Sequence, residues 1–248
     1  MFPISDDNSD RRLTPFVTWA IIAVNVLVFV VFQGLGSNER FTYAFATVPA
    51  EIISGKDIVT PDRTQRDEQT GQSIVRPGLQ PTPGSVYLTL LTAIFMHGGI
   101  AHLAGNMWFL FIFGDNVESA LGRIRYLIFY LATGLLASLA HVATSQLLGA
   151  DLAVPCLGAS GAISGILGGY LLLFPHRRVR VLLLRQISDV PALVAVGMWF
   201  VFQLISGLGM LGGASGGVAY GAHIGGFLAG LMLVRLVGAR DSSQPSRR

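Results

Sequence analysis

The chain has 248 residues, of which 52% are hydrophobic and only 12% are charged, and its mean hydropathy is +0.59. Soluble domains carry about 25% charged residues, so this composition predicts a membrane protein. The formal net charge is +3, and its arginines lie beside apolar segments, without an evident basic face. This pattern argues against nucleic-acid binding. A single cysteine, Cys156, excludes an internal disulfide.

The first apolar segment follows a polar and acidic start, residues 1–13, which we interpret as a cytoplasmic segment. No convincing cleavage site follows it, so we expect a retained helix rather than a signal peptide. A membrane span needs about 20 apolar residues. Six segments approach this length, and they predict an all-α membrane protein whose domain covers residues 14–238. The segments are 15–32, 100–114, 126–148, 157–174, 190–207 and 218–237.

Arginines mark one side of this predicted bundle. They precede the first segment, lie between the second and third and between the fourth and fifth, and follow the sixth. Since basic residues favour the cytoplasmic side, both termini are predicted to be cytoplasmic. The tail, residues 239–248, is expected to be disordered. The absence of an arginine-rich, acid-poor segment before the first helix favours a bacterial plasma membrane over an organelle.

Two connections on the predicted outer side stand out. The first, residues 33–85, is long and contains a polar insertion at 55–83 with several prolines and glycines. We expect this insertion to lack a core of its own and to have a mobile tip. The second, residues 207–217, is rich in glycine. It is either a flexible connector or a movable cap over an outer site.

A serine and a histidine lie near the outer ends of two predicted spans. Polar side chains within spans are costly and usually functional. Ser160 and His223 each lie about 5–10 Å below the start of their helix at a rise of about 1.5 Å per residue. The pair supplies a hydroxyl nucleophile and a base that can accept its proton. For Ser160 alone, the competing interpretation is a small packing residue in a glycine-rich helix contact.

The second span adds two polar residues at the same level. His102 and Asn106 are four residues apart, so they share one face of a helix. With the backbone N–H groups at the helix start around Ser160, they predict an oxyanion site. His223 would accept the serine proton and pass it to the leaving amine. No Asp or Glu is placed to complete a triad, so the sequence predicts a Ser–His dyad.

Small residues surround the predicted dyad. Gly158 and Gly161 leave space for a backbone to approach Ser160. Gly226 and Gly230 form a small-xxx-small face on the last span. We expect this face to pack against the fourth span, where glycines also recur every four residues: Gly161, Gly165 and Gly169.

Taken together, these motifs resemble those of rhomboid intramembrane serine proteases. The matching segments run from Phe95 to Gly230 in the order of that family. The resemblance implies a six-helix core, a Ser–His dyad in a water-filled cavity open to the outside, and no metal or cofactor. It also implies single-pass membrane proteins as substrates, cut near the outer membrane face. The motifs are Phe95-Met96-His97, His102-Leu103-Ala104-Gly105-Asn106, Gly114-Asp115-Asn116-Val117-Glu118, Gly158-Ala159-Ser160-Gly161 and Ala222-His223-Ile224-Gly225-Gly226.

The chain departs from this family at the position four residues after the serine. Some members carry a tyrosine there that stacks on the histidine, whereas this chain has Ser164. Another residue must therefore hold His223, and Tyr220 is a nearby candidate. The chain also lacks a Trp-Arg pair that some members have in the first loop, and the insertion at 55–83 is extra.

Other assignments stay open at this point. A non-catalytic rhomboid-like protein that binds transmembrane helices is the main alternative, and a small-solute transporter is a third reading without clear inverted repeats. His97 and His141 are interpreted as structural, and zinc binding by His97 with His102 lacks a third ligand. Trp199, Phe200 and Phe202 are candidates for a lateral substrate entrance. The expected partners are the lipid bilayer and membrane-protein substrates.

Overall fold

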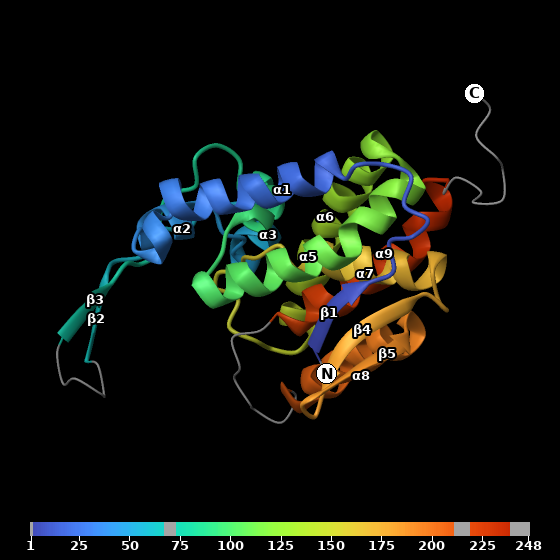
Figure 1. The fold of residues 1–248 in the computed structure, drawn as a ribbon. Coiled ribbons are helices and arrows are strands. Elements are labelled where there is room, and N and C mark those ends of the chain that lie inside the picture. The colour runs from blue at the N-terminus through green and yellow to red at the C-terminus, as the bar shows by residue number, and fades with distance from the viewer. Residues whose placement is uncertain (1, 67–72, 211–218, 239–248) are drawn as a thin grey trace.

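Helices make up 63% of the chain in the computed structural model, which describes residues 2–66, 73–210 and 219–238. A helix lies at each of the six predicted spans (Figure 1). The predicted tail, 239–248, and residues 211–217 of the glycine-rich connection lie outside the described residues. The six helices are α1 (Phe16–Leu27, continued by the π-helical turn Val28–Phe32), α5 (Ile100–Leu121), α6 (Arg123–Leu147), α7 (Ser160–Leu173), α8 (Ala192–Met210) and α9 (Tyr220–Leu236).

These helices differ in length. Among the described residues, α6 alone is long and apolar enough to cross a membrane by itself. The segment Val86–Phe95 and α5 pass the same test together, with a bend of 78° between them. The other four are shorter apolar helices of 10–17 residues, with α8 counted to Gly207. The helical architecture thus fits a membrane protein, while the number of spans and the orientation stay predictions.

Strands occur in two connections and at the N-terminus, so the all-α prediction was incomplete. β4 (Arg178–Leu183) and β5 (Gln186–Pro191) form an antiparallel hairpin, and β1 (Phe2–Asp6) pairs with β4. In β4, buried Val179 and Val181 alternate with exposed Arg178, Arg180 and Leu182, which is the pattern of a strand with one face covered. The segment predicted as a separate N-terminal region therefore forms part of this sheet.

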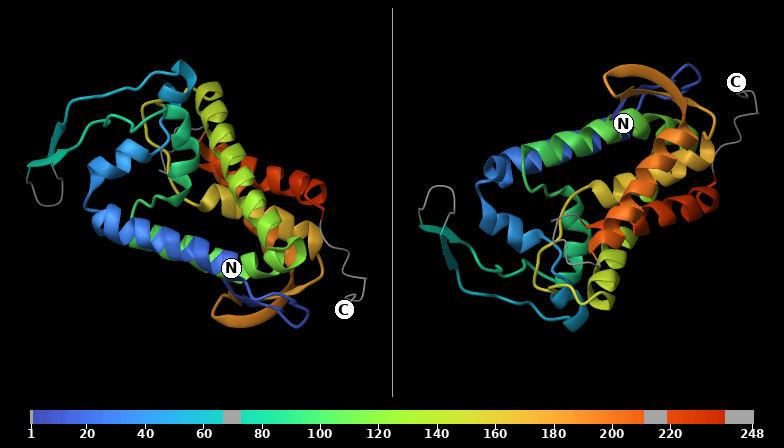
Figure 2. Two further views of the ribbon diagram at one scale, coloured as in Figure 1. Left: turned by 90° about the horizontal axis from the view of Figure 1, so that it is seen from above. Right: turned by 90° about the horizontal axis from the view of Figure 1, so that it is seen from below.

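The long first connection also has structure. It contains the turn Gly34–Gly36, α2 (Glu39–Phe45) and α3 (Pro49–Ser54), and it is followed, before α5, by the turn Val86–Leu88, α4 (Thr89–Thr92) and the turn Ala93–Phe95. Within the polar insertion, β2 (Arg63–Arg66) and β3 (Ser73–Arg76) form an antiparallel hairpin, which the sequence analysis did not predict. This hairpin projects away from the helices (Figures 1 and 2). Its tip, 67–72, lies outside the described residues.

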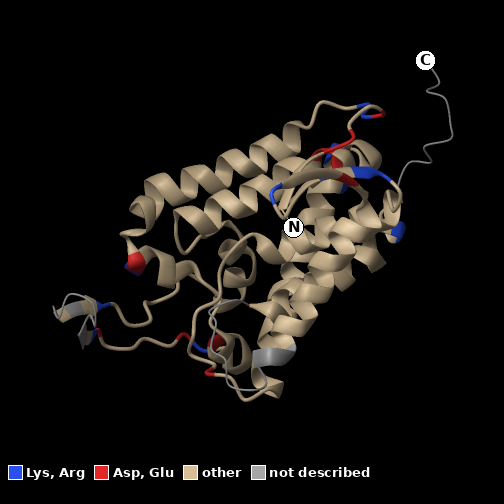
Figure 3. Cartoon of the chain, turned by 60° about the horizontal axis from the view of Figure 1, so that its bottom comes forward, with Lys and Arg blue, Asp and Glu red and all other residues tan. Residues whose placement is uncertain are grey.

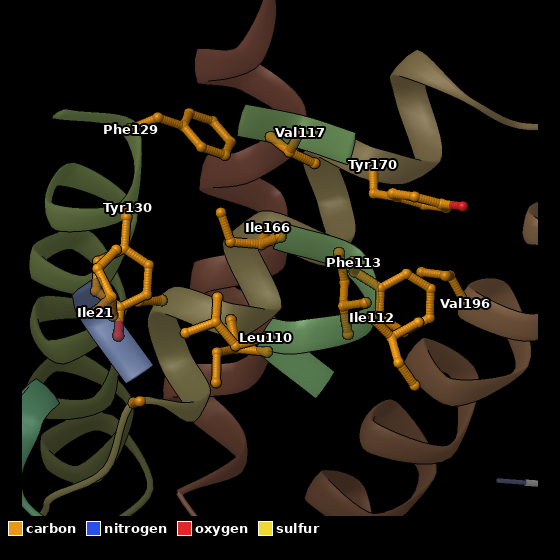
Figure 4. Close-up of a cluster of buried hydrophobic side chains, with 14 of the residues drawn as sticks. Ile21, Leu110, Ile112, Phe113, Val117, Phe129, Tyr130, Ile166, Tyr170 and Val196 are labelled. Carbon is orange, nitrogen blue, oxygen red and sulfur yellow. The ribbon is translucent and has the colours of Figure 1, made fainter. Parts of the chain in front are cut away.

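The core surrounds α7, which packs against α5, α6 and α9. Leu110 of α5, Tyr130 of α6 and Ile166 of α7 are fully buried (Figure 4). All residues from Gly161 to Tyr170 are buried, as expected for a helix that is apolar on every side. Ser160, at the first position of α7, is thereby attached to the most enclosed element of the fold.

Glycines bring the backbones of α7 and α9 into contact. A Cβ atom added at Gly226 would lie 2.1 Å from the carbonyl oxygen of Gly161, and one at Gly230 would lie 2.0 Å from that of Gly165. Gly169 is different, because its Cβ position faces the ring of Phe129 on α6. The close approach thus involves both glycines of the small-xxx-small face and two of the three on α7.

Charged residues gather beside β1 and β4 at one end of the bundle and, away from it, in the first connection and its hairpin (Figure 3). We call the end beside β1 and β4 the basic end, defined by Arg11, Arg177 and Arg180. Arg11 pairs with Asp115 of α5 at 2.7 Å, and Arg180 pairs with Asp189 at 2.9 Å. Glu118 of α5 accepts hydrogen bonds from the start of α1. Asp115 and Glu118 therefore join the N-terminal region to the bundle, and Asp189 links the two strands of the hairpin, rather than completing a catalytic triad.

Asp6 connects β1 to this end of the bundle. Its Oδ2 atom accepts hydrogen bonds from the hydroxyl of Tyr170 at 2.7 Å and from Nδ2 of Asn116 at 2.6 Å. Burial is the main cause that raises the pKa of Asp6 from 3.8 to about 7, and the nearby Asp115 adds to it. Arg177 acts in the opposite direction but does not cancel the effect of burial.

We expect β1 to loosen as the pH rises through about 7. A carboxyl group whose pKa is raised in the folded state favours that state below its ordinary pKa, and the contribution is lost above the raised value. Hydrogen exchange of the β1 amides, corrected for intrinsic rates, should therefore show less protection at pH 8.5 than at pH 5.5. Asp6→Asn should remove this difference. Equal protection of wild type at the two pH values would contradict the assignment.

Candidate active site

The loop before α7 places Ser160. Gly158 has a φ of +128°, a conformation that favours glycine, and its N–H donates to the carbonyl oxygen of Ala93 at 2.9 Å. Cys156 and Thr47 exchange two backbone hydrogen bonds of 2.8 and 2.9 Å. The first connection therefore fixes this loop from the side, which the sequence did not predict. Ser160 follows at the start of α7, where backbone N–H groups have no partner within the helix.

His223 meets Ser160 directly. It lies in the first turn of α9, and its Nε2 atom is 2.8 Å from Oγ of Ser160. The glycine contact between α7 and α9 begins one turn further along, at Gly226. Close approach of the two backbones thus places a base within hydrogen-bonding distance of a hydroxyl at a helix N-terminus.

The other ring nitrogen of His223 contacts a residue that the sequence reasoning missed. Oε1 of Gln203 on α8 is 2.8 Å from Nδ1 of His223. Gln203 is only 7% exposed. A polar residue within an apolar span was the available signal, the same one that identified Ser160 and His223.

Several other groups surround this pair of hydrogen bonds. The rings of Tyr220 and Trp199 each have their centroid 6.2 Å from that of His223. Tyr220, the residue expected to hold the histidine, therefore lies close, with its ring edge-on at 82°. Ser164, at the position where some members carry a tyrosine, donates its hydroxyl to the carbonyl oxygen of Ser160 at 2.6 Å.

His102 and Asn106 both lie on α5, as expected. A Cβ atom added at Gly158 would be 3.0 Å from Nε2 of His102 and 3.7 Å from Oγ of Ser160, so the imidazole lies beside the serine. Asn106 is 9% exposed, and its buried Nδ2 has no hydrogen-bond partner among the described residues. An amide donor without a partner is suited to an anion that forms only during a reaction.

His97 lies behind this layer. It is 1% exposed, its backbone N–H donates to Oε1 of Gln33 at 2.9 Å, and its ring packs edge-on against that of His102 with the centroids 5.2 Å apart. Within the described ranges, no group of three His, Cys, Asp or Glu residues could hold a metal ion. The chemistry available from the residues that meet here is that of a hydroxyl, imidazoles and an amide.

A cavity of about 440 Å³ lies between α5 and α8, and its lining includes Gln203, the hydrogen-bond partner of His223. Its walls include Phe109 and Phe113 from α5 and Trp199 and Phe202 from α8. Two of the three aromatic residues expected at a lateral entrance thus line it. The third, Phe200, is stacked on Phe227 of α9 at 4.1 Å.

Comparison with known proteins identifies the family. The model of the Rhomboid domain matches residues 84–240. Rhomboid protease GluP of Bacillus subtilis is 38% identical over 153 residues, which is 60% of this chain and 28% of that protein. Rhomboid protein 1, mitochondrial, of Saccharomyces cerevisiae is 29% identical over 65% of this chain and 45% of its own length. RHOMBOID-like protein 4 of Arabidopsis thaliana is 34% identical over 58% of this chain and 32% of its own length.

The chain spans less than half the length of each of these relatives. The match to the Rhomboid domain nevertheless extends over more than half of the present chain and includes α5 to α9 with His102, Asn106, Ser160, Gln203 and His223. This protein therefore belongs to the rhomboid family.

Proposed function

We propose that this protein is an intramembrane serine endopeptidase that uses a Ser160–His223 dyad. The observation that carries the proposal is the 2.8 Å contact between Oγ of Ser160 and Nε2 of His223, made at the N-terminus of a buried helix. A base at hydrogen-bond distance from a hydroxyl is the arrangement that activates a serine nucleophile. Membership of a family that includes serine intramembrane proteases supports the same reading.

The reaction follows from the positions of these groups. Oγ of Ser160 attacks the carbonyl carbon of a peptide bond, and its proton moves to Nε2 of His223. The oxyanion lies near the free N–H groups at the start of α7, with His102 and Asn106 as further donors. His223 then protonates the leaving amine. Water then attacks the acyl carbon as His223 takes its proton, and the carboxylic acid is released as the bond to Oγ breaks and His223 returns the proton to Ser160.

The substrates we propose are single-pass membrane proteins, cut near the outer face of a bacterial plasma membrane. Six spans with both termini in the cytoplasm would place the basic end inside, in agreement with the arginine pattern. Ser160 and His223 would then lie near the outer ends of their spans, where water can reach the acyl-enzyme. The cavity between α5 and α8 would receive part of the substrate from the side.

The alternative is a rhomboid-like protein that binds transmembrane helices without cutting them. Such a protein has no need of an activated serine. The two functions are therefore separated by the reactivity of Ser160 rather than by binding to a membrane protein.

A fluorophosphonate probe tests the proposal. We expect covalent labelling of Ser160 in wild-type protein purified in detergent, and no labelling of His223→Ala, because the hydroxyl then lacks its base. Mass spectrometry of the labelled peptide identifies the modified residue, and a heat-denatured sample serves as the control for non-specific reaction. Labelling of wild type and His223→Ala at the same rate would favour the non-catalytic alternative.

A further inference from the structure

We infer that Gln203 is a positioning residue that orients His223 and sets its tautomer. The inference rests on the proposed protease function and deepens it. The imidazole lies between two polar groups on different helices: Oγ of Ser160 on α7 is 2.8 Å from Nε2, and Oε1 of Gln203 on α8 is 2.8 Å from Nδ1.

The chemistry of the amide determines which tautomer is favoured. An amide oxygen is only an acceptor, so its contact with Nδ1 requires a proton on that nitrogen. In neutral imidazole the other nitrogen then carries the lone pair, and here that atom is Nε2, which faces Ser160. The opposite tautomer would direct an N–H group at the serine and could not accept its proton.

The surroundings make this hydrogen bond effective. Gln203 is buried, and water competes poorly for hydrogen bonds within a protein interior. Trp199 lies one helical turn before Gln203, and its ring lies between 6 and 7 Å from those of His223 and Phe227, centroid to centroid. Phe200 stacks on Phe227. Aromatic contacts between α8 and α9 thus hold the amide opposite the imidazole.

Gln203 also accounts for the missing tyrosine. Ser164 occupies the position from which an aromatic ring would stack on the histidine, and its hydroxyl bonds to the backbone instead. In this protein the imidazole of His223 is instead oriented by its hydrogen bond to Gln203, which lies on a different helix, α8. A neutral amide orients the ring but, unlike a carboxylate, adds no charge that would stabilise the protonated form.

The test uses two substitutions with different chemistry. Gln203→Met has a similar length and no comparable acceptor, whereas Gln203→Glu keeps an acceptor and adds charge. We expect Gln203→Met to lower the maximal rate of fluorophosphonate labelling about 10–100-fold, the range found when the partner that orients a metal-ligating histidine is removed. The probe concentration at half-maximal rate should stay unchanged, because a positioning residue acts on His223 rather than on probe binding.

Gln203→Glu tests the pH dependence of labelling, which should not change if Gln203 only stabilises the fold. Its carboxylate favours the protonated imidazole, so the acidic limb of the labelling rate against pH should shift to higher pH than in wild type. Val201→Ala, on the same helix with a side chain 51% exposed, is the matched control and should label like wild type. Thermal unfolding in detergent compares the stability of all three variants.

The outcomes separate this inference from the function on which it rests. If wild type labels at Ser160 but Gln203→Met stays within twofold of it and Gln203→Glu leaves the pH profile unchanged, the positioning role is wrong and the protease proposal stands. If wild type itself fails to label, both are overturned. If Gln203→Met unfolds, the shifted acidic limb of Gln203→Glu decides the question.

Discussion

Ser160→Ala and His223→Ala should each reduce proteolysis by about 10⁴-fold or more, because nucleophile and base act as one unit. The measurement is release of the outer fragment of a single-pass membrane substrate by purified protein in detergent or liposomes. Ser160→Ala removes one hydrogen bond of 2.8 Å and His223→Ala removes two, and each is worth about 1 kcal/mol of stability. The variants should therefore remain folded, with unfolding temperatures close to that of wild type.

Asn106→Ala provides a graded comparison within the same experiment. It leaves the dyad intact and removes one proposed donor to the oxyanion, so the expected loss is about 10²–10³-fold. If Asn106→Ala keeps wild-type activity, Asn106 takes no part in the mechanism, and the proposal of a Ser160–His223 dyad is unaffected. Wild-type activity in purified Ser160→Ala would reject the mechanism itself.

Gly230→Ala should destabilise the fold more than any substitution within the dyad. The new Cβ atom would lie 2.0 Å from the carbonyl oxygen of Gly165, and a backbone atom inside the core cannot rotate away as a side chain can. Overpacking of this kind costs about 1–3 kcal/mol or more. The unfolding temperature in detergent should fall, and activity should fall with it, because α9 also carries His223.

Gly197→Ala is the matched control for this substitution. Gly197 is also a helical glycine, but a Cβ atom there would meet nothing within 4 Å. Replacing a helical glycine by alanine in open space is favourable by about 1 kcal/mol, so stability should be kept or increased. The same unfolding temperature for Gly230→Ala and Gly197→Ala would show that α7 and α9 are not in tight contact.

The helices of the bundle could be predicted because their signal is local. Each of the six apolar segments found in the sequence coincides with a helix, with ends that differ by only a few residues except at α5, which extends to Leu121. The strands were missed because their pairing is not local. β1 and β4 are separated by more than 170 residues, and nothing within residues 2–6 specifies a partner strand.

The pairing of Ser160 with His223 could be anticipated because the depth of a residue along a helix axis follows from counting residues in the sequence. Counting residues from the helix starts places both side chains at one level, and small residues allow the helices to meet. No comparable count predicts Gln203. Whether it reaches His223 depends on how far α8 is rotated about its own axis and how closely it approaches α9.

The sequence alone thus determined the membrane-protein class, the positions of the helices and the chemical types available near one end of the bundle. These follow from hydrophobic periodicity, helix rise and residue chemistry, which are properties of short segments. Only the tertiary structure decided that the first connection fixes the loop before Ser160, and that an amide on α8 rather than Tyr220 bonds to His223. Such contacts join residues far apart in the chain, so packing of whole helices selects them.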